Sequence, residues 1–444
     1  MQMTSLIGHT HELLGIIRGS DKPADSLIDT FYRSRKYLGS HDRGFITKVT
    51  YATLRNWRRC EYHLDQSLDS VQDELLPSDR LMLVLVTSLI LFPASQTLTV
   101  KILEPLVKSL RLKELLPQLF ENLQKPEQFP SASLKERLAV QYSFPDWMIE
   151  QFISLYGDEE AEKLCASMNE PAPLTIRVNT LKTDVETCQK EMAKQEIETA
   201  PVQYSPFGLN VTRRVNMFSL NAFRDGLFEV QDEGSQLLPL FIDPKPNAKV
   251  LDACAGAGGK TLELAALMKN RGEIFASDIN KFRLEELKKR TKRAGVQNVR
   301  ILPVDSIDEL HETYSGFFDI VLVDAPCSGL GTIRRNPGMK WMVTKEMIDE
   351  IAEKQKMILR SAAPLVKPGG RLVYATCTIL NQENENQIKS FLETNQDYCL
   401  LDASSIVGKW NFITMASNRF IKLLPHRHHT DGFFCAMMEK ISAR

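Results

Sequence analysis

Two cysteines stand in short motifs whose residue types could perform chemistry. Cys327 lies in DAPCSGLGT (324–332) and Cys377 lies in ATCTILNQENE (375–385), and each follows the end of a predicted strand. A single cysteine in such a place is more often a small buried apolar residue than a nucleophile. Two thiols that follow strands expected to be neighbours, near the carboxyl group of Asp324, instead indicate a reactive site.

The loop after the first predicted strand of this region is glycine-rich but matches neither common phosphate-binding loop. In LDACAGAGGKTLELAAL (251–267), Cys254 stands where a Walker A loop needs its first glycine, and Thr261 stands where a dinucleotide fingerprint needs its last. Asp278 lies 22 residues beyond Gly256, at the end of the next predicted strand, where a carboxylate accepts hydrogen bonds from ribose hydroxyls. The loop therefore favours a nucleoside without phosphates, of which S-adenosylmethionine is the common example.

A methyl donor and two thiols together fit the methylation of carbon 5 of a cytosine. Carbon 5 is a poor nucleophile, so an enzyme must first add a thiolate to carbon 6, which makes the ring an enamine. A carboxyl group must hold ring nitrogen 3 and the exocyclic amine, and Asp324 is placed for that role. Because a free thiol has a pKa of about 8.5, the nucleophile needs activation, and the cleft around Lys260 is a candidate source. Enzymes that methylate amino groups carry Asp/Asn-Pro-Pro-aromatic in this turn, whereas this chain has Asp-Ala-Pro-Cys.

A regular alternation of strands and helices after residue 236 would position these motifs. Short apolar strands are predicted at 249–254, 273–278, 299–304, 319–324 and 370–376. Helical stretches lie between them, for example at 281–294 and 344–366. The alternation predicts an α/β Rossmann-like methyltransferase domain, with a mostly parallel sheet and helices on both faces. Ligands of such sheets bind beyond the carboxyl ends of the strands. We therefore expect one crevice to be lined by the residues that end these strands, namely Asp252, Asp278, Asp305, Asp324 and Cys377.

The sequence before this region predicts two further parts. Apolar residues recur at helical spacing over 26–68 and 79–123, which indicates an all-helical domain over residues 1–135. A helical linker and a small α/β module follow over residues 136–235. The methyltransferase domain then occupies residues 236–444.

Composition and charge narrow the classes of protein. The 444 residues include 55 basic and 56 acidic side chains, so any surface for nucleic acid must be local. The eight cysteines have no Cys-x-x-Cys spacing and the N-terminus lacks the layout of a signal peptide, which favours a reduced, cytoplasmic protein. The apolar run at 81–92 is too short to span a bilayer and stops at Pro93, so we expect a buried helix there.

A basic stretch within the helical region is the candidate surface for RNA. Residues 33–59 contain eight basic side chains and one acid, with Tyr37, Phe45, Tyr51 and Trp57 interleaved. Basic side chains can neutralise phosphates, and aromatic rings can stack on unpaired bases. The same pattern also fits a solvated helix face whose aromatic residues belong to the core.

Three further stretches contain residues that could contact RNA or metal. Arg334 and Arg335, shortly after Cys327, are placed to meet the substrate backbone. The basic residues of 281–293 are instead expected on an exposed amphipathic face. PHRHHTDGFF (425–434) is rich in histidine but has no cysteine or acidic partner at ligand spacing, so we expect a polar loop near the RNA and no metal site.

Several motifs resemble those of the RNA 5-methylcytosine methyltransferases of the Nol/Nop/Sun family. The matching stretches are DACAGAGGKT (252–261), ASDIN (276–280), DAPCSGLGT (324–332), ATCT (375–378) and TDGFF (430–434). RVNTLK (177–182) and GLFEVQDEGSQL (226–237) resemble the small module that precedes the catalytic domain in this family. The helical region, with LGSHDRGFITKVTYATLRNWRRCEYHL (38–64), resembles the NusB-like RNA-binding domain of the family's Sun/Fmu-type branch, which comprises bacterial enzymes acting on small-subunit rRNA.

The resemblance implies a role for each motif residue. Cys377 would be the nucleophile and Cys327 would assist proton removal and product release, while Asp324 and Lys260 would face the cytosine. The methyl donor S-adenosylmethionine would contact Ala255, Gly256, Ala257, Gly258, Gly259, Lys260, Asp278, Arg283, Asp305 and Asp324. Within that set, Asp278 would bind the ribose, Asp305 the adenine, and the backbone of 255–259 the methionine end.

The substrate that the resemblance implies is a cytidine of small-subunit rRNA, flipped out of its stack. Neither DNA nor a membrane is expected as a partner. A monomer is the default expectation. Two alternatives stay open at this point. One is a cytosine-5 methyltransferase that acts on tRNA. The other is a non-catalytic RNA-binding or antitermination-type factor that keeps the methyltransferase fold as a scaffold.

Overall fold

The predicted alternation of strands and helices builds one sheet in the second half of the chain. The computed structural model describes residues 1–68, 76–93, 98–107, 110–213, 215–404, 415–417 and 419–441. Contacts divide the chain into two units, each with its own core. One unit comprises Met1–Glu170 and Ile333–Thr344, and the other comprises Pro171–Thr332 and Lys345–Arg444.

The larger unit is built on a sheet in the order β11-β12-β13-β9-β8-β5-β6-β7, with β10 paired to β13. Strands β5, β6, β7, β8 and β9 are parallel, and β13 is antiparallel to β9. Strands β10 and β12 are in turn antiparallel to β13, and β11 is antiparallel to β12. The described strands are β5 (Lys249–Asp252), β6 (Glu273–Asp278), β7 (Val299–Pro303), β8 (Phe318–Asp324), β9 (Val366–Thr376), β10 (Tyr398–Leu400), β11 (Ala416–Ser417), β12 (Phe420–Leu423) and β13 (Phe433–Lys440). The chain passes from β5 to β6 on one side and later to β8 on the other, so the strand order reverses between β5 and β8.

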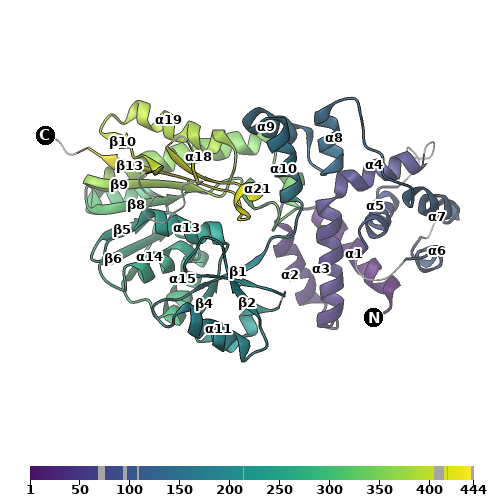
Figure 1. The fold of residues 1–444 in the computed structure, drawn as a ribbon, viewed down its shortest axis with the longest axis horizontal. Coiled ribbons are helices and arrows are strands. Elements are labelled where there is room, and N and C mark those ends of the chain that lie inside the picture. The colour runs from purple at the N-terminus through teal and green to yellow at the C-terminus, as the bar shows by residue number, and fades with distance from the viewer. Residues whose placement is uncertain are drawn as a thin grey trace. The chain divides into compact units, whose positions relative to one another are not determined.

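Helices cover both faces of this sheet, as predicted (Figure 1). Neighbouring residues of a strand point to opposite faces: Val250 packs with α13 and α14, and Leu251 packs in the cluster that includes α18 and α19. The longer helices are α13 (Glu233–Ile242), α14 (Gly259–Leu267), α15 (Lys281–Ala294), α18 (Lys345–Ala362) and α19 (Glu385–Thr394). Shorter ones are η4 (Ile307–Leu310), α16 (His311–Tyr314), η5 (Leu330–Thr332), η6 (Ala363–Leu365), η7 (Asn381–Glu383) and α21 (Pro425–His428).

A small antiparallel sheet precedes the large one within the same unit, in the order β2-β3-β1-β4. Its elements are β1 (Leu174–Val178), α11 (Val185–Ala193), β2 (Thr199–Pro201), β3 (Gly208–Val211), η3 (Met217–Ser219), α12 (Asn221–Arg224) and β4 (Phe228–Val230). The buried pair of Arg177 and Glu263, at 3.4 Å, joins β1 to α14. Burying such a pair requires further hydrogen bonds, and Gln231 bonds to both side chains.

The other unit is helical throughout its described residues. Its elements are α1 (Met3–Arg18), α2 (Ala24–Ser34), α3 (Ser40–Arg55), α4 (Trp57–Leu68), α5 (Pro77–Leu91), α6 (Val100–Leu103), η2 (Glu104–Leu106), α7 (Leu110–Leu123), α8 (Leu134–Gln141), α9 (Asp146–Tyr156), α10 (Asp158–Met168) and α17 (Met339–Met342). Residues 94–97 and 108–109 of the predicted helical stretch lie outside the described residues. The run at 81–92 forms most of α5 and is largely buried, as predicted.

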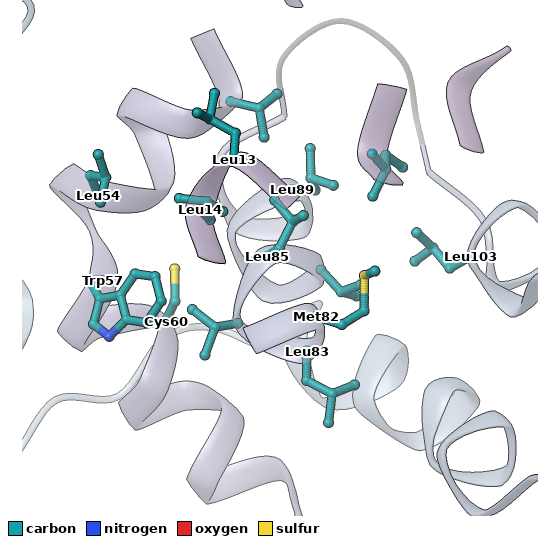
Figure 2. Close-up of a cluster of buried hydrophobic side chains, with 14 of the residues drawn as sticks. Leu13, Leu14, Leu54, Trp57, Cys60, Met82, Leu83, Leu85, Leu89 and Leu103 are labelled. Atoms are coloured by element: carbon teal, nitrogen blue, oxygen red, sulfur yellow. The ribbon is translucent and has the colours of Figure 1, made fainter. Parts of the chain in front are cut away.

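The core of the helical unit gathers around α5 (Figure 2). Leu85 of α5 is completely buried, together with Leu13 of α1 and Cys60 of α4. Truncation of such a leucine to alanine costs about 2–5 kcal/mol, because lost burial and a residual cavity both count. Among the described residues, no helix has the length and apolar composition needed to cross a membrane.

Residues 333–344 interrupt the chain between β8 and α18 and pack within the helical unit. Trp341 of α17 packs against the core of the helical unit and donates a 2.7 Å hydrogen bond to the carbonyl of Leu54. Lys340 is completely buried and lies over the ring of Phe144. Its ammonium group donates hydrogen bonds to the carbonyls of Arg55, Tyr142 and Ser143 and to Oδ1 of Asn169.

Candidate active site

The candidate residues gather where β5 and β8 end, at the reversal of the strand order. Ligands of open α/β sheets bind at such a reversal, outside the carboxyl ends of the strands. Asp324 is the last residue of β8 and is paired in register with Ala375 of β9. This register brings the turn after β8 beside the turn after β9, and the two cysteines follow in those turns.

The loop after β5 uses glycine where the backbone requires it. Gly258 has a φ of 86°, and a Cβ on it would lie 2.0 Å from Cδ1 of Leu287. The amides of Ala255, Gly256 and Gly258 already donate within the protein, to the carbonyl of Ser277, the carboxylate of Asp278 and the carbonyl of Ala255. In the part of the chain that the structure describes, the amides of Ala257 and Gly259 are therefore the candidates for donors to a ligand. A Cβ on Gly259 would meet nothing within 4 Å.

The other candidate cofactor residues lie at the ends of β6 and β7. Asp278 accepts hydrogen bonds from the amides of Gly256 at 2.8 Å and Asn280 at 2.7 Å. The guanidinium of Arg283 reaches the same loop, since a Cβ on Gly256 would lie 3.9 Å from its Nη1. Asp305 is exposed and forms a 3.1 Å ion pair with Lys281.

Lys260 and Asp324 form an ion pair across the reversal point, with 2.6 Å between Nζ and Oδ2. Burial alone would lower the pKa of Lys260, but its attraction and hydrogen bond to Asp324 outweigh that effect, and Cys377 and Asp252 add to them. The pKa of Lys260 is therefore raised. Lys260 consequently provides a fixed positive charge that acts on Cys377.

Asp252, at the end of β5, is a second carboxylate beside this ion pair. It is 1% exposed, and Oδ2 accepts a hydrogen bond from Thr261 while Oδ1 has no described partner. Burial raises the pKa of Asp252 to about 7, and the negative charge of Asp324 contributes to the rise. Asp252 therefore titrates near neutral pH.

The two thiols are in direct contact and partly exposed. The sulfur atoms of Cys327 and Cys377 are 3.3 Å apart, and the amide of Cys377 donates to the sulfur of Cys327 at 3.3 Å. The hydrogen bond with Cys377 and then burial raise the pKa of Cys327 well above its ordinary value, followed by the charges of Cys377 and Glu383. Cys327 is thus a protonated thiol at neutral pH. Two thiols at this edge of the sheet therefore lie close enough to take part in one reaction.

The TDGFF stretch (430–434) is hydrogen-bonded to the turns that carry the thiols. The amide of Gly331 donates to the carbonyl of Cys377 at 2.9 Å, and the amide of Gly432 donates to the carbonyl of Gly331 at 2.8 Å. A Cβ on Gly331 would lie 2.2 Å from the carbonyl oxygen of Gly432. Only glycine permits this approach of three backbone segments.

The histidine-rich stretch differs from the predicted polar loop. Residues 425–428 form the short helix α21, in which His428 is buried and its Nδ1 accepts a hydrogen bond from the amide of Leu424. Thr430 and Asp431 are each 1% exposed, whereas Arg427 and His429 are exposed, so the prediction of a polar loop is wrong only for the helical residues 425–428. The stretch turns inward because it leads directly into β13, a buried strand. Among the described residues, no group of three or more His, Cys, Asp or Glu could hold a metal ion.

The basic face of 281–293 is exposed only in part. Lys288 and Lys289 are exposed, as predicted. Arg290 and Arg293 instead lie against Glu229 of β4, at 2.9 and 2.6 Å, so the prediction is wrong for these two residues. The small sheet covers the end of α15 and provides a buried carboxylate for them. Arg290 also donates to the carbonyl of Ala257 at 2.8 Å, which links β4 to the glycine-rich loop.

In the basic stretch 33–59, most of the aromatic residues belong to the core. Trp57 is buried, and Phe45 and Tyr51 pack against the core, while Tyr37 is 63% exposed. Several of the arginines form ion pairs within the helical unit: Arg33 with Asp29, Arg35 with Glu12, Arg58 with Asp146, and Arg59 with Glu127. Of the two interpretations of this stretch, Phe45, Tyr51 and Trp57 therefore fit the one in which the aromatic residues belong to the core.

Arg334 and Arg335 belong to the segment that packs in the helical unit. Arg334 is 4% exposed, and its carbonyl accepts a hydrogen bond from Arg55. A side chain this buried is not a surface contact for an RNA backbone, so that expectation is wrong for Arg334. Arg335 is exposed.

Sequence reasoning missed the residues that hold the two cysteine turns together. Glu383 contacts Ser328 and Thr378, which directly follow the two cysteines. Asn384 contacts Thr376 and Thr378 on either side of Cys377. The signal was present, since the quoted stretch ATCTILNQENE places acids a few residues after the thiol, but spacing does not reveal burial.

Comparison with known proteins assigns the family. The model of the family "16S rRNA methyltransferase RsmB/F" matches residues 239–439, and that of the RsmF/B-like ferredoxin-like domain matches residues 144–218. A probable ribosomal RNA small subunit methyltransferase B from Synechocystis sp. is 32% identical over 96% of this chain and 98% of its own length.

Two solved structures agree with this assignment. The crystal structure of PH0851 is similar with a TM-score of 0.78 and 30% identity, over 99% of each chain. The structure of NSun6 from Pyrococcus horikoshii with SFG is similar with a TM-score of 0.60 and 25% identity, over 68% of this chain and 99% of that one. The chain thus belongs to the 16S rRNA methyltransferase RsmB/F family of enzymes.

Proposed function

We propose that this chain transfers a methyl group from S-adenosylmethionine to carbon 5 of a cytidine in small-subunit rRNA. One observation carries the proposal: two thiols with their sulfur atoms 3.3 Å apart lie at the ends of the adjacent strands β8 and β9, beside the Lys260–Asp324 pair. Methylation of cytosine at carbon 5 needs a thiol nucleophile and a group that manages the later proton removal. The relatives named for rRNA support the class of substrate.

The residues of the β5 loop fit S-adenosylmethionine, which supplies the methyl group when it is bound. The open space beside Gly259 and the unpartnered oxygen of the buried Asp252 support a ligand at this loop. Asp278 would hold the ribose through its remaining lone pairs, and Asp305 would contact the adenine. The amides of the loop, together with Arg283, would hold the methionine end.

Cys377 acts as the nucleophile in this proposal. Its thiolate forms a bond to carbon 6 of the cytosine, and the electron pair of the carbon 5–carbon 6 double bond becomes available at carbon 5. Asp324 accepts a hydrogen bond from the exocyclic amine and orients the ring. Lys260 places a positive charge near Cys377, and the interaction between the two groups contributes to the raised pKa of the lysine.

Cys327 acts in the second half of the reaction. After carbon 5 has taken the methyl group, its proton must leave, and the freed electron pair restores the double bond and expels the sulfur of Cys377. Cys327 contacts that sulfur. Once Cys377 is bonded to carbon 6, its hydrogen bond and charge no longer hold the proton on Cys327. Cys327 then releases this proton to solvent, and its thiolate accepts the proton from carbon 5 while Cys377 leaves as a thiolate. Different surroundings thus separate the roles of the two thiols, because Lys260 acts on one and Glu383 on the other.

Mapping of 5-methylcytosine by mass spectrometry tests the proposal. We expect cells without this gene to lack one mark in small-subunit rRNA, and the wild-type gene but not Cys377→Ala to restore it. A missing mark in tRNA would keep the chemistry and change the substrate. Unchanged maps of both RNAs would contradict the proposal and favour a non-catalytic factor, which family membership already disfavours.

A further inference from the structure

Glu383 is a carboxylate that is completely buried at the site, and the proposed reaction forms no bond to it. Its Oε1 accepts hydrogen bonds from the amide of Ser328 at 2.7 Å and from Nε2 of Gln355 at 3.2 Å. Its Oε2 accepts from the hydroxyl of Ser328 at 2.5 Å and from that of Thr378 at 2.8 Å. All of these partners are neutral donors. A buried carboxylate is costly unless hydrogen bonds satisfy it, and here both oxygens are satisfied.

These hydrogen bonds join the two turns that carry the thiols. Ser328 directly follows Cys327, and Thr378 directly follows Cys377. The two hydroxyls also contact one another at 3.0 Å, so the carboxylate and both hydroxyls form one cluster. Charge-assisted hydrogen bonds of this kind are about twice as strong as neutral ones. One side chain therefore links the two turns, in addition to the hydrogen bond from the amide of Gly331 to the carbonyl of Cys377.

The next residue secures the Cys377 turn from the other side. Nδ2 of Asn384 donates to the carbonyl of Thr378 at 3.1 Å, and Oδ1 accepts from the hydroxyl of Thr376 at 2.5 Å. Asn384 is completely buried as well. Thr376 and Thr378 flank Cys377, so both neighbours of this cysteine are held by the segment that begins with Glu383, one through its hydroxyl and one through its carbonyl.

We infer that Glu383 is a positioning residue, which holds the Cys327 and Cys377 turns in the arrangement that brings their sulfur atoms to 3.3 Å. The importance of this arrangement for catalysis rests on the proposed function. Glu383 also has an electrostatic effect that Asn384 lacks. Its negative charge opposes ionisation of the Cys327 thiol, after the larger effects of Cys377 and burial.

Glu383→Gln separates these contributions from simple loss of structure. An amide nitrogen in place of Oε2 can donate to the hydroxyls of Ser328 and Thr378, which can rotate to accept, so the fold is kept while the charge is lost. Glu385→Gln is the matched control. It removes a carboxylate two residues away that bonds to Lys422 at 2.7 Å and has no described contact with either cysteine turn.

The first measurement needs no substrate. The full-length proteins are treated with iodoacetamide at slightly alkaline pH, and labelling of each cysteine is followed by peptide mass spectrometry. We expect Glu383→Gln to label Cys327 about 3–10 times faster than wild type, since alkylation follows the thiolate fraction, and Glu385→Gln to match wild type. Labelling of Cys327 at the wild-type rate in folded Glu383→Gln would overturn the inference.

The second measurement is methyl transfer to rRNA. We expect kcat of Glu383→Gln to fall about 10–100-fold, because small misplacements of reacting groups have effects of this size. KM for RNA and for the methyl donor should stay within about twofold, since no binding group is removed. An unchanged kcat, or equal losses in Glu385→Gln, would contradict a positioning role.

Two further outcomes are distinguishable. If Glu383→Gln does not fold, Ser328→Ala removes one hydroxyl of the same cluster and should change Cys327 labelling and kcat in a smaller but measurable way. Unchanged values there would also overturn the inference. If wild type transfers no methyl group to RNA, the proposed function fails, while the labelling comparison still decides whether Glu383 acts on the Cys327 thiol.

Discussion

Each of the two units encloses a lysine, and the pKa values of these lysines move in opposite directions. Lys340 in the helical unit is surrounded by neutral oxygens and by Phe144, and burial lowers its pKa well below the ordinary value. Lys260 at the sheet edge is also largely buried, but its pairing with Asp324 raises its pKa. Burial alone therefore does not identify a catalytic lysine.

The difference lies in what each ammonium group faces. Lys340 uses its donors on carbonyls and an amide of three helical segments, which is the pattern of a structural link. Lys260 pairs with one carboxylate and is near a thiol and a second carboxylate, so its charge can act on the groups that are proposed to react. Substitution of each lysine should therefore affect a different property of the protein.

The largest expected effect is on catalysis at the sheet edge. Lys260→Met should lower methyl transfer by about 100–1,000-fold, because a fixed charge beside the nucleophile is lost. The free energy of unfolding should change by only about 1 kcal/mol, since Asp324 is partly exposed and can be solvated. Single-turnover kinetics and urea denaturation measure the two quantities. Lys289→Met, at an exposed position of α15, is the control. If Lys260→Met transferred methyl groups as fast as Lys289→Met does, Lys260 would have no part in the mechanism.

The next effect is on stability in the helical unit. Lys340→Met should lower the free energy of unfolding by about 2–3 kcal/mol, because buried acceptors lose their donor. Urea denaturation followed by circular dichroism measures this loss, and Lys36→Met provides an exposed control in the same unit. Equal midpoints for the two variants would mean that Lys340 does not link the helices.

A smaller effect is expected where β4 supports the glycine-rich loop. Arg290→Met removes the pair with Glu229 and the hydrogen bond to the carbonyl of Ala257. We expect the Kd for S-adenosylmethionine to rise about 5–10-fold, as the loss of one charge-assisted hydrogen bond implies. Equilibrium dialysis measures the Kd, with Lys289→Met again as the control. An unchanged Kd would show that the loop holds its shape without Arg290.

The smallest effect concerns pH. The pKa of Asp252 is about 7 in the folded protein, against about 3.9 in an unfolded chain. Between these values the folded state keeps a proton that the unfolded state has lost, so this group makes the free energy of unfolding fall as pH rises. Asp252→Asn removes that fall. The urea midpoint of Asp252→Asn should rise relative to that of wild type as the pH increases from 5 to 8. A constant difference between the two midpoints over this range would falsify the raised pKa.

Much of the catalytic half could be predicted from the sequence. Strands and helices such as β6 and α15 lie where periodicity and turn residues predict them, because local pattern and tertiary burial agree there. The meeting of Cys327 and Cys377 follows from the parallel order of β8 and β9. The family resemblance is confirmed by the comparisons.

Contacts between segments distant in sequence could not be predicted. Nothing in the pattern of 333–344 reveals that Lys340 is buried among helices that precede it by some two hundred residues. Arg293 is equally ambiguous, because an arginine on an amphipathic face is exposed unless another element supplies a carboxylate, as Glu229 does. Whether a charged side chain is buried depends on whether another element supplies an oppositely charged group. A single sequence does not show which element does so.

Trapping of the covalent adduct tests the central claim, that Cys377 attacks and Cys327 assists release. Cys327→Ala and Cys377→Ala would each be incubated with small-subunit rRNA and S-adenosylmethionine, followed by denaturing electrophoresis and peptide mass spectrometry of any RNA-linked protein. We predict that Cys327→Ala accumulates an adduct at Cys377, and that Cys377→Ala forms none. An adduct at Cys327 in the Cys377→Ala protein would contradict the account.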